Sequence, residues 1–558
     1  MASSARTRRE ELPDGYSFSL DSREIVVPAH PPSPELRDGL LDRARSTSCF
    51  DLIVVGGGAT GLGTALDAAA RGFSTLLVEA DDFGKGTSSR ATKLVHGGVR
   101  YLAQGNVSLV REALRERKLF LDNAPHLAQP LPFVVPAYGL AGRLVDLPFY
   151  RLGLGIYEAL SGSERLGRVA LLGRRDALAA APGLAPHRLV GAVRYVDGQF
   201  DDARYAVALA RTAIRLGATV LNRCRVTEVL RQADRVAGVG VEDRETGRRF
   251  AVHGRCIVNA TGVWVDALRR LDEPACPELV TPSQGVHLVV DRDRFPATAA
   301  MLVPKTSDGR VLFAVPWLGK VILGTTDTPR HDTPLEPRPL DGEVEFILDE
   351  AGRRLAAPLS RADVRSAWVG LRPLVKPPSE RTATRRISRE HTVEVSAHGL
   401  VTVTGGKWTT YRAMAESVLD ACARHGLLPE RPAGATRHLR LVGAPPAGTA
   451  PVPLSEPPGP HLYGTEAAVV ATLPGADRLL LPGLSEAMVR FAARHELARS
   501  VEDVLARRSR WLFLDARRAA EAATAVAVIL GEELGDGFDA SASATGFTAL
   551  ADSYRLPG

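Results

Sequence analysis

The stretch from Asp51 to Glu79 constrains the fold of this chain more than any other. Asp51 to Val55 is an almost continuous apolar run, which is typical of a parallel strand buried on both faces. It leads into the glycine pattern G-x-G-x-x-G at residues 56–61 and then into a helical stretch. A second apolar run, Thr75 to Val78, ends in the acid Glu79. Strand, glycine turn, helix, strand and acid in this order predict a βαβ unit that binds a dinucleotide.

Each glycine has a physical role in such a unit. Gly56 permits the tight turn, Gly58 lets a pyrophosphate approach the backbone, and Gly61 allows close packing of helix on strand. The N–H groups and dipole at the start of the helix would face the phosphates. Glu79 would accept hydrogen bonds from the adenosine ribose hydroxyls. This fingerprint alone does not distinguish FAD from NAD.

Length and composition bound the remaining choices. With 558 residues the chain exceeds the size of one usual core, so we expect two or three domains. The 45% hydrophobic and 24% charged residues exclude disordered, collagen-like and disulfide-scaffold classes. The five cysteines are far apart and form no C-x-x-C pair, so we expect reduced thiols of a cytoplasmic protein and assign no metal. The net charge of +6 is small for this size and decides nothing alone; we expect no nucleic-acid partner.

The chain divides into four segments. Residues 1–48 are polar and proline-rich, with no secretory signal, and we expect a loosely ordered extension with one short helix near 35–45. Strand-like and helical runs alternate over residues 49–440, which indicates α/β structure. Residues 441–464 read as a Pro/Gly-rich linker, and residues 465–558 as a helical domain. No stretch reaches the roughly 18 apolar residues of a spanning helix, so any membrane contact would be peripheral.

The segment after Glu79 favours FAD. Residues 82–90 form a polar, hydroxyl-rich loop where an NAD domain would usually continue to its next helix and strand, and such a loop can wrap a bound cofactor. It continues as K-L-V-H-G-G-V-R-Y-L at residues 93–102. Here the sequence closely resembles the FAD-dependent glycerol-3-phosphate dehydrogenases, whose signature is T-S-S-x-x-(S/T)-K-L-(I/V)-H-G-G-(L/V)-R-Y-L. Further segments similar to that family follow at residues 283–290, 324–327, 370–374, 387–391 and 405–411. Trp408, where a smaller residue is commoner, and the long N-terminal extension are departures.

The resemblance implies a fold and an activity. The fold is α/β, with a Rossmann-type FAD-binding domain interleaved with a mixed-sheet substrate domain of the glutathione-reductase and D-amino-acid-oxidase kind, plus a C-terminal helical domain. The activity is oxidation of sn-glycerol 3-phosphate to dihydroxyacetone phosphate by hydride transfer from C2 to N5 of FAD. Electrons would pass to a membrane quinone, which places the enzyme on the inner face of the cytoplasmic membrane. A homodimer is also compatible with the family.

The matching segments supply the candidate site residues. We assign the cofactor to the glycine turn and Glu79 together with Thr87, Ser88, Ser89, Lys93, His96, Gly97, Gly262 and Gly406. A phosphate dianion needs cations, and arginine's planar fork suits it. Catalytic roles fall to His287, Arg372 and Lys407, and substrate binding to Arg100, Tyr101, Thr326 and Arg389.

His287 and Lys407 have distinct chemistry. Imidazole titrates near working pH, so His287 can accept the hydroxyl proton or hydrogen-bond the substrate hydroxyl; a structural histidine is the alternative. Gly406 and Lys407 lie between a strand and a helix whose positive end can stabilise the anion that forms on a reduced flavin, and Lys407 adds a full charge. Residues 147–157 carry aromatics beside an arginine and fit either a membrane interface or the core.

Three other functions stay open from the sequence. A glycerol-3-phosphate oxidase shares the first half-reaction but uses oxygen. A related FAD-dependent dehydrogenase of a 2-hydroxy acid or an amino acid would bind one carboxylate instead of a phosphate. A non-catalytic flavin- or nucleotide-binding protein would have lost the Arg, His and Lys positions, which this sequence keeps.

Overall fold

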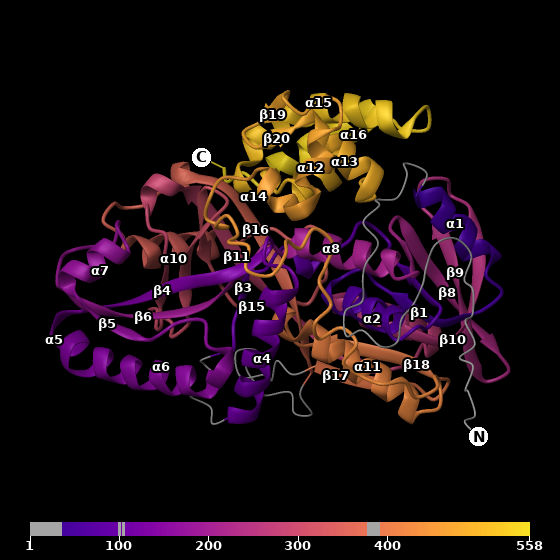
Figure 1. Cartoon of the computed structure of the whole chain (residues 1–558), viewed down its shortest axis with the longest axis horizontal. Coiled ribbons are helices and arrows are strands. Elements are labelled where there is room, and N and C mark those ends of the chain that lie inside the picture. The colour runs from indigo at the N-terminus through magenta and orange to yellow at the C-terminus, as the bar shows by residue number, and fades with distance from the viewer. Residues whose placement is uncertain (1–35, 99–101, 103–105, 377–390, 558) are drawn as a thin grey trace, which may run out of the picture.

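Two sheets form the body of the protein, and the chain passes back and forth between them. The computed structural model describes residues 36–98, 102, 106–376 and 391–557. Residues 50–90, 202–272 and 391–424 build the body around the first sheet, and residues 94–200 and 280–375 build that around the second. Figure 1 shows the two bodies side by side, with the C-terminal helices over the region where they meet. The predicted fold class, with interleaved α/β domains and a helical C-terminal domain, is confirmed.

The first sheet, which we call the cofactor sheet, is parallel at its centre. Its order is β17-β18-β10-β1-β2-β7, and the hairpin β8–β9 continues from β10. Strands β1, β2 and β18 and the last four residues of β10 are almost completely buried, because α2, α8 and α11 pack on this sheet. This burial explains their uninterrupted apolar sequences. The strands are β1 (Phe50–Val55), β2 (Thr75–Val78), β7 (Thr219–Leu221), β8 (Cys224–Gln232), β9 (Arg235–Asp243), β10 (Arg249–Asn259), β17 (His391–Val395) and β18 (Leu400–Gly405).

The second sheet, which we call the substrate sheet, is mixed and mostly antiparallel. Its order is β15-β11-β14-β13-β12-β4-β6-β3, with β16 on β11 and β5 on β6. The long β11–β16 pair lies at one edge of the substrate sheet, and β16 reaches the cofactor sheet, where it contacts β18. The strands are β3 (Leu94–Val95), β4 (Ala128–Tyr138), β5 (Ala170–Gly173), β6 (Leu189–Phe200), β11 (Val280–Asp291), β12 (Ala300–Val303), β13 (Leu312–Trp317), β14 (Lys320–Gly324), β15 (Thr328–Pro329) and β16 (Val364–Val375).

Helices surround both sheets. In the cofactor body these are α1 (Leu36–Ser46), α2 (Ala59–Ala70), α8 (Asp202–Arg215), α9 (Val265–Asp272) and α11 (Tyr411–Arg424). In the substrate body they are α4 (Val107–Asn123), α5 (Gly139–Ala141), the π-turn η2 (Gly142–Asp146), α6 (Leu147–Ser161), α7 (Arg174–Ala180) and α10 (Asp341–Gly352). No helix within the described ranges combines the length and hydropathy needed to cross a bilayer.

The C-terminal domain is helical apart from one short strand pair. Its elements are η9 (Pro460–Glu466), α12 (Ala467–Ala471), β19 (Leu479–Leu481), β20 (Leu484–Ser485), α13 (Glu486–His495), the π-turn η10 (Asp503–Arg508), α14 (Trp511–Leu514), α15 (Ala516–Leu534) and α16 (Ala540–Asp552). Their buried apolar faces share one core with β4, β6 and β16 of the substrate sheet. The domain is therefore docked on the substrate body through a common core.

Two segments outside the central block pack onto the bodies: the end of the N-terminal extension, where the sequence predicts a short helix, and the Pro/Gly-rich linker. The last part of the N-terminal extension is α1, whose Leu40 and Leu41 are buried against the cofactor body while Arg37 lies 2.7 Å from Asp243. The segment 441–464 packs along both bodies. Its backbone bonds include Val442 N–H to the Thr212 hydroxyl (3.1 Å) and Leu318 N–H to the Leu454 carbonyl (2.7 Å). Long-range partners of this kind leave no local pattern in the sequence.

Candidate active site

The glycine turn lies at the carboxyl edge of the cofactor sheet, between β1 and α2. Gly56 has φ +111°, and a Cβ there would lie 2.6 Å from the Ala260 carbonyl oxygen at the end of β10. A Cβ on Gly61 would lie 1.9 Å from the Gly56 carbonyl oxygen. Gly58 is the N-cap of α2 and offers no side-chain cap. The start of α2 thus presents backbone N–H groups and the positive end of its dipole, which suits a pyrophosphate.

Glu79 lies at the end of β2, directly beside this turn. Its carboxylate accepts hydrogen bonds from Gly57 N–H (2.6 Å) and Asp81 N–H (2.8 Å). Burial outweighs these two bonds and raises the pKa of Glu79 to about 7. The half-buried carboxylate is placed where a ribose would follow a pyrophosphate on α2. The glycine cradle, the uncapped helix and the acid together fit an adenine dinucleotide.

The segment after β2, residues 81–93, joins both sheets, and we call it the cofactor loop. The Ser88 hydroxyl accepts a hydrogen bond from Ala59 N–H in the first turn of α2 (2.9 Å). The Thr87 hydroxyl donates to the Leu371 carbonyl of β16 (2.5 Å). The Trp408 indole N–H donates to the Ser88 carbonyl (2.9 Å). The loop is held from three directions, as expected of a segment that contacts a cofactor.

Lys93 is the last residue of this loop, and its ammonium forms hydrogen bonds inside the protein. Its side chain is fully buried, and its ammonium donates to Asp202 (2.7 Å) and to the Ser89 carbonyl (2.8 Å). Burial lowers the pKa of Lys93 to about 7, against the effect of Asp202. We expected a cofactor contact from Lys93; the structure gives its ammonium two intramolecular acceptors that shape the loop instead.

The His96-Gly97 segment meets the segment around Gly406. His96 N–H donates to the Thr409 hydroxyl (3.3 Å), and Gly97 N–H donates to the buried Tyr157 hydroxyl (2.7 Å). Gly406 has φ +75°, which favours glycine at this position. Lys407 is half-buried and is the N-cap of the short 3₁₀ turn η8 (Trp408–Thr410). Gly262, with φ +64°, begins the 3₁₀ turn η4 (Gly262–Trp264) after β10, and its carbonyl accepts from the Thr404 hydroxyl (3.4 Å). These motif segments are brought together at the same edge of the cofactor sheet.

His287 lies on β11, on the side of the substrate sheet that faces the cofactor loop. Its Nε2 is 2.9 Å from the Thr92 hydroxyl, and its ring stacks on Trp368 of β16 with centroids 5.3 Å apart. Burial, together with the charges of Lys93 and Arg372, holds the pKa of His287 well below its usual value. The imidazole is therefore neutral at pH 7.

Arg372 lies near His287 on the same face of the β11–β16 pair. Ser283 pairs with Arg372 and His287 with Trp368, so an even number of residues separates the two positions on each strand. The guanidinium donates to the Thr326 carbonyl (3.0 Å) and lies 3.7 Å from Asp327. A Cβ on Gly285 would lie 2.3 Å from that guanidinium, so only glycine there lets Arg372 lie flat over β11. At 21% exposure, Arg372 retains access to a ligand.

Thr326 points away from this position. Its buried hydroxyl donates to Glu343 of α10 (2.9 Å) and accepts from Val286 N–H (3.0 Å). We expected a substrate contact from this hydroxyl; the structure instead uses the Thr326 carbonyl as a partner of Arg372. The remaining substrate-side predictions, Arg100, Tyr101 and Arg389, lie outside the described residues.

Comparison with known proteins decides the family. The model for FAD dependent oxidoreductases matches residues 51–412, and that for the C-terminal domain of alpha-glycerophosphate oxidase matches residues 435–539. The mitochondrial glycerol-3-phosphate dehydrogenase of Macaca fascicularis is 39% identical over 571 positions, covering 95% of this chain and 76% of that protein. The chain belongs to the FAD-dependent glycerol-3-phosphate dehydrogenases.

Other relatives agree with this assignment. The probable mitochondrial glycerol-3-phosphate dehydrogenase of Caenorhabditis elegans is 40% identical over 534 positions, covering 90% of this chain and 73% of that protein. The structure of the Bacillus halodurans glycerol-3-phosphate dehydrogenase complexed with FAD superposes with a TM-score of 0.73 and 30% identity, covering 94% of this chain and 97% of that one. FAD is the cofactor of this dehydrogenase, as the hydroxyl-rich loop predicts, and glycerol 3-phosphate its substrate.

Several residues of this dehydrogenase site carry no motif signal. Trp368, which stacks on His287, and Asp202, which neutralises Lys93, lie outside the matching segments, whereas Thr92, the hydroxyl partner of His287, is the (S/T) position of the signature and was given no role. The pair Asp201-Asp202 directly after β6 was the available hint, because adjacent acids are seldom fully buried without a cation. Trp408, noted from the sequence only as a departure from the family, is a hydrogen-bond donor to the cofactor loop.

Proposed function

We propose that this glycerol-3-phosphate dehydrogenase oxidises C2 of sn-glycerol 3-phosphate by hydride transfer to flavin N5 and passes the electrons to a membrane quinone. FAD, when bound, supplies the electron acceptor for the C2–H bond. The observation that carries the proposal is the contact between Nε2 of His287 and the Thr92 hydroxyl of the cofactor loop, with Arg372 on the same sheet face. It supports the proposal because a neutral imidazole and a guanidinium then lie close to the cofactor loop.

In this proposal the cationic residues and the neutral His287 have different roles. Arg372, joined by Lys407 and by Arg100 and Arg389, binds the phosphate dianion through charge-assisted hydrogen bonds. Nε2 of His287, the ring nitrogen that faces the cofactor loop, accepts the hydroxyl proton of the substrate. Lys407 and the start of α11 supply the positive charge that a reduced flavin requires. The protein thus contributes orientation, a base and electrostatic stabilisation.

One experiment separates this reaction from its alternatives. The yellow holoenzyme is mixed without air with glycerol 3-phosphate, 2-hydroxyglutarate or glycine, and flavin bleaching is followed. We expect bleaching with glycerol 3-phosphate alone; bleaching by either of the others would replace the proposed substrate. Reoxidation is then compared with a ubiquinone analogue and with oxygen, and one hydrogen peroxide per turnover would assign an oxidase instead.

The exposed face of α5, η2 and α6 supports contact with a membrane. Apolar side chains protrude along it, with Phe149 65% and Leu152 67% exposed. Exposed Arg143 and Arg151 lie among them, which complements an anionic lipid surface. The face lies at the edge of the molecule away from the C-terminal domain (Figure 1). The large apolar residues on it are Leu140, Leu144, Val145, Phe149, Leu152 and Ile156.

Vesicle binding tests this surface. We expect Phe149→Glu/Leu152→Glu to lose cosedimentation with vesicles of phosphatidylglycerol and phosphatidylcholine, while activity with a soluble dye acceptor is kept. Val528→Glu, at an exposed apolar position of α15, is the matched control and should still bind. If the wild-type protein does not bind vesicles and is a homodimer, while the double variant is a monomer, the face is a dimer interface and the membrane proposal fails.

A further inference from the structure

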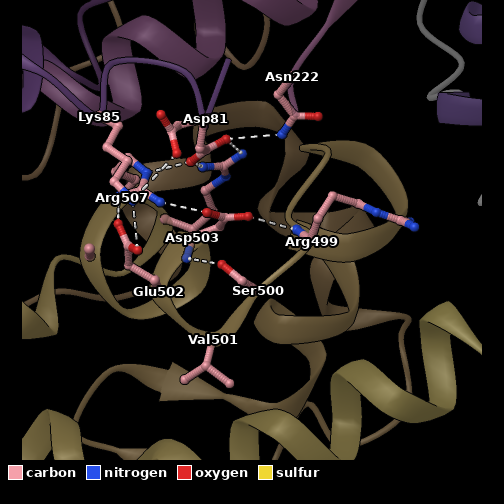
Figure 2. A network of polar contacts seen from close by, with 12 residues as sticks. Asp81, Lys85, Asn222, Arg499, Ser500, Val501, Glu502, Asp503 and Arg507 are labelled. Carbon is pink, nitrogen blue, oxygen red and sulfur yellow. Dashed lines mark hydrogen bonds and ion pairs between the residues drawn. The ribbon is translucent and has the colours of Figure 1, made fainter. Parts of the chain in front are cut away.

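Three arginines of the C-terminal domain reach into the cofactor loop at its two ends. At the first end, the Asp82 carboxylate is fully buried and accepts hydrogen bonds from Arg507 and Arg508. The Asn222 amide also donates to Asp82 (3.1 Å), and Arg507 also donates to Asp503 of its own domain. Figure 2 shows this network between the segment Asp81–Lys85 and the turn that carries Glu502 to Arg507. The network fixes the first end of the loop on the C-terminal domain.

Arg510 reaches the other end of the loop. It is completely buried and has φ +68°, a left-handed conformation that residues with a side chain seldom adopt. This conformation, between η10 and α14, carries the side chain inward. One guanidinium nitrogen, Nη2, donates both to the Ser89 carbonyl (3.0 Å) and to the Asp202 carboxylate (2.9 Å). These are the same two groups that accept from Lys93. The Asp202 carboxylate and the Ser89 carbonyl are therefore each bound by two basic side chains, Lys93 of the loop and Arg510 of the C-terminal domain.

The position of Ser89 matters because of its neighbour. The Ser88 hydroxyl accepts from Ala59 N–H at the start of α2, and the Ser88 carbonyl accepts from the Trp408 indole. Movement of the Ser89 carbonyl would carry Ser88 away from both contacts. Arg510 is thus connected to the helix start where the pyrophosphate of FAD binds by a hydrogen bond to Ser89, the peptide backbone from Ser89 to Ser88, and the hydrogen bond of the Ser88 hydroxyl with Ala59 N–H.

We propose that Arg510 is a positioning residue for FAD binding: it fixes Ser89, and through Ser88 the first turn of α2, so that the C-terminal domain sets the affinity of the dehydrogenase for its cofactor. A purely structural role is the competing explanation, since other buried ion pairs join this domain to α8. Arg211 and Glu466 form one such pair, with two bonds of 2.6 and 2.8 Å, and within the described residues neither forms a hydrogen bond or an ion pair with the cofactor loop. This pair provides the matched control.

The test compares Arg510→Lys with Arg211→Lys. Both changes keep the positive charge at a buried site and remove the planar fork. Dissociation constants are measured by titrating apoprotein with FAD and following flavin fluorescence, and melting temperatures are measured with and without FAD. We expect Arg510→Lys to weaken FAD binding about tenfold and to reduce the rise in melting temperature that FAD produces. Arg211→Lys should lower both melting temperatures together and leave the FAD constant unchanged.

A second variant covers the case in which lysine is not tolerated. Asp202→Asn/Arg510→Gln removes one charge of each sign, so Lys93 and Asp201 remain as a balanced pair. Weakened FAD binding in every Arg510 variant that folds supports the proposal. A constant within about twofold of wild type in a folded variant, or an equal change in Arg211→Lys, overturns it. If neither Arg510 variant gives folded apoprotein while Arg211→Lys does, Arg510 serves the fold alone, and the proposal is likewise overturned.

Discussion

The cofactor side and the substrate side of the active site are built by opposite means. On the cofactor side, the turn at Gly56, the start of α2 and Glu79 lie within one short βαβ unit, and most contacts are made by backbone groups. On the proposed substrate side, His287 and Arg372 come from two strands far apart in the sequence and would act through side chains. A change on the first side should therefore remove the cofactor, whereas a change on the second should alter catalysis and leave FAD bound.

The largest expected effect is that of Gly61→Ala. The added Cβ would lie 1.9 Å from the Gly56 carbonyl oxygen, so the turn and α2 must move apart. We expect FAD binding to weaken by more than about 100-fold, measured as the flavin-to-protein ratio after gel filtration. Gly39→Ala, in α1 with open space around the new Cβ, should keep its FAD. A fully loaded Gly61→Ala protein would show that the turn is not the binding element.

His287→Gln should separate catalysis from cofactor binding. Loss of a positioned base slows proton transfer by about 100-fold or more, so anaerobic flavin reduction should slow by that factor with FAD retained. Stopped-flow absorbance measures the rate, and His398→Gln, a change at an exposed turn, is the control. Because the pKa of His287 lies well below 6.5, its ionisation should produce no inflection of the wild-type rate near pH 6.5. A rate close to that of wild type would assign His287 a structural role.

Arg372→Ala should change the KM for the substrate and leave FAD binding unchanged. Removing the guanidinium should raise KM for glycerol 3-phosphate about 100-fold, equivalent to about 2.7 kcal/mol, with the FAD content unchanged. Arg365→Ala lies on the same strand but its guanidinium pairs with Asp291 and is 42% exposed, so its KM should stay at the wild-type value. Equal KM values for the two variants would remove Arg372 from the substrate site.

Glu79→Gln gives the smallest effect, of about tenfold in FAD affinity. In the apoprotein the pKa of Glu79 is about 7, and ribose hydroxyls donate to the ionised carboxylate. A proton must therefore leave on binding below pH 7, so the affinity of the wild type should fall as the pH is lowered from about 8 to 5. Fluorescence titration at several pH values measures this, and Glu79→Gln should lose the slope. An unchanged slope in the variant would assign the titration to another group.

The same contrast explains which predictions the sequence supported. The glycine turn could be predicted from the sequence because its contacts are local. The parallel strands could be predicted because burial on both faces requires apolar runs. The ion pair of Lys93 with Asp202 could not be predicted, because the two residues lie on different elements and no sequence pattern links them. The orientation of Thr326 toward Glu343 of α10 was missed for the same reason, although its motif was recognised.

The sequence by itself determined the class of cofactor, the family and the order of the structural blocks, because backbone geometry and apolar periodicity act over short stretches of chain. Only the tertiary structure decided which charged side chains are paired inside the protein. A buried charge must find its counter-ion in space, and partners such as Arg510 and Asp202 lie 308 residues apart. The roles of Lys93, Thr326 and the C-terminal arginines follow from that requirement.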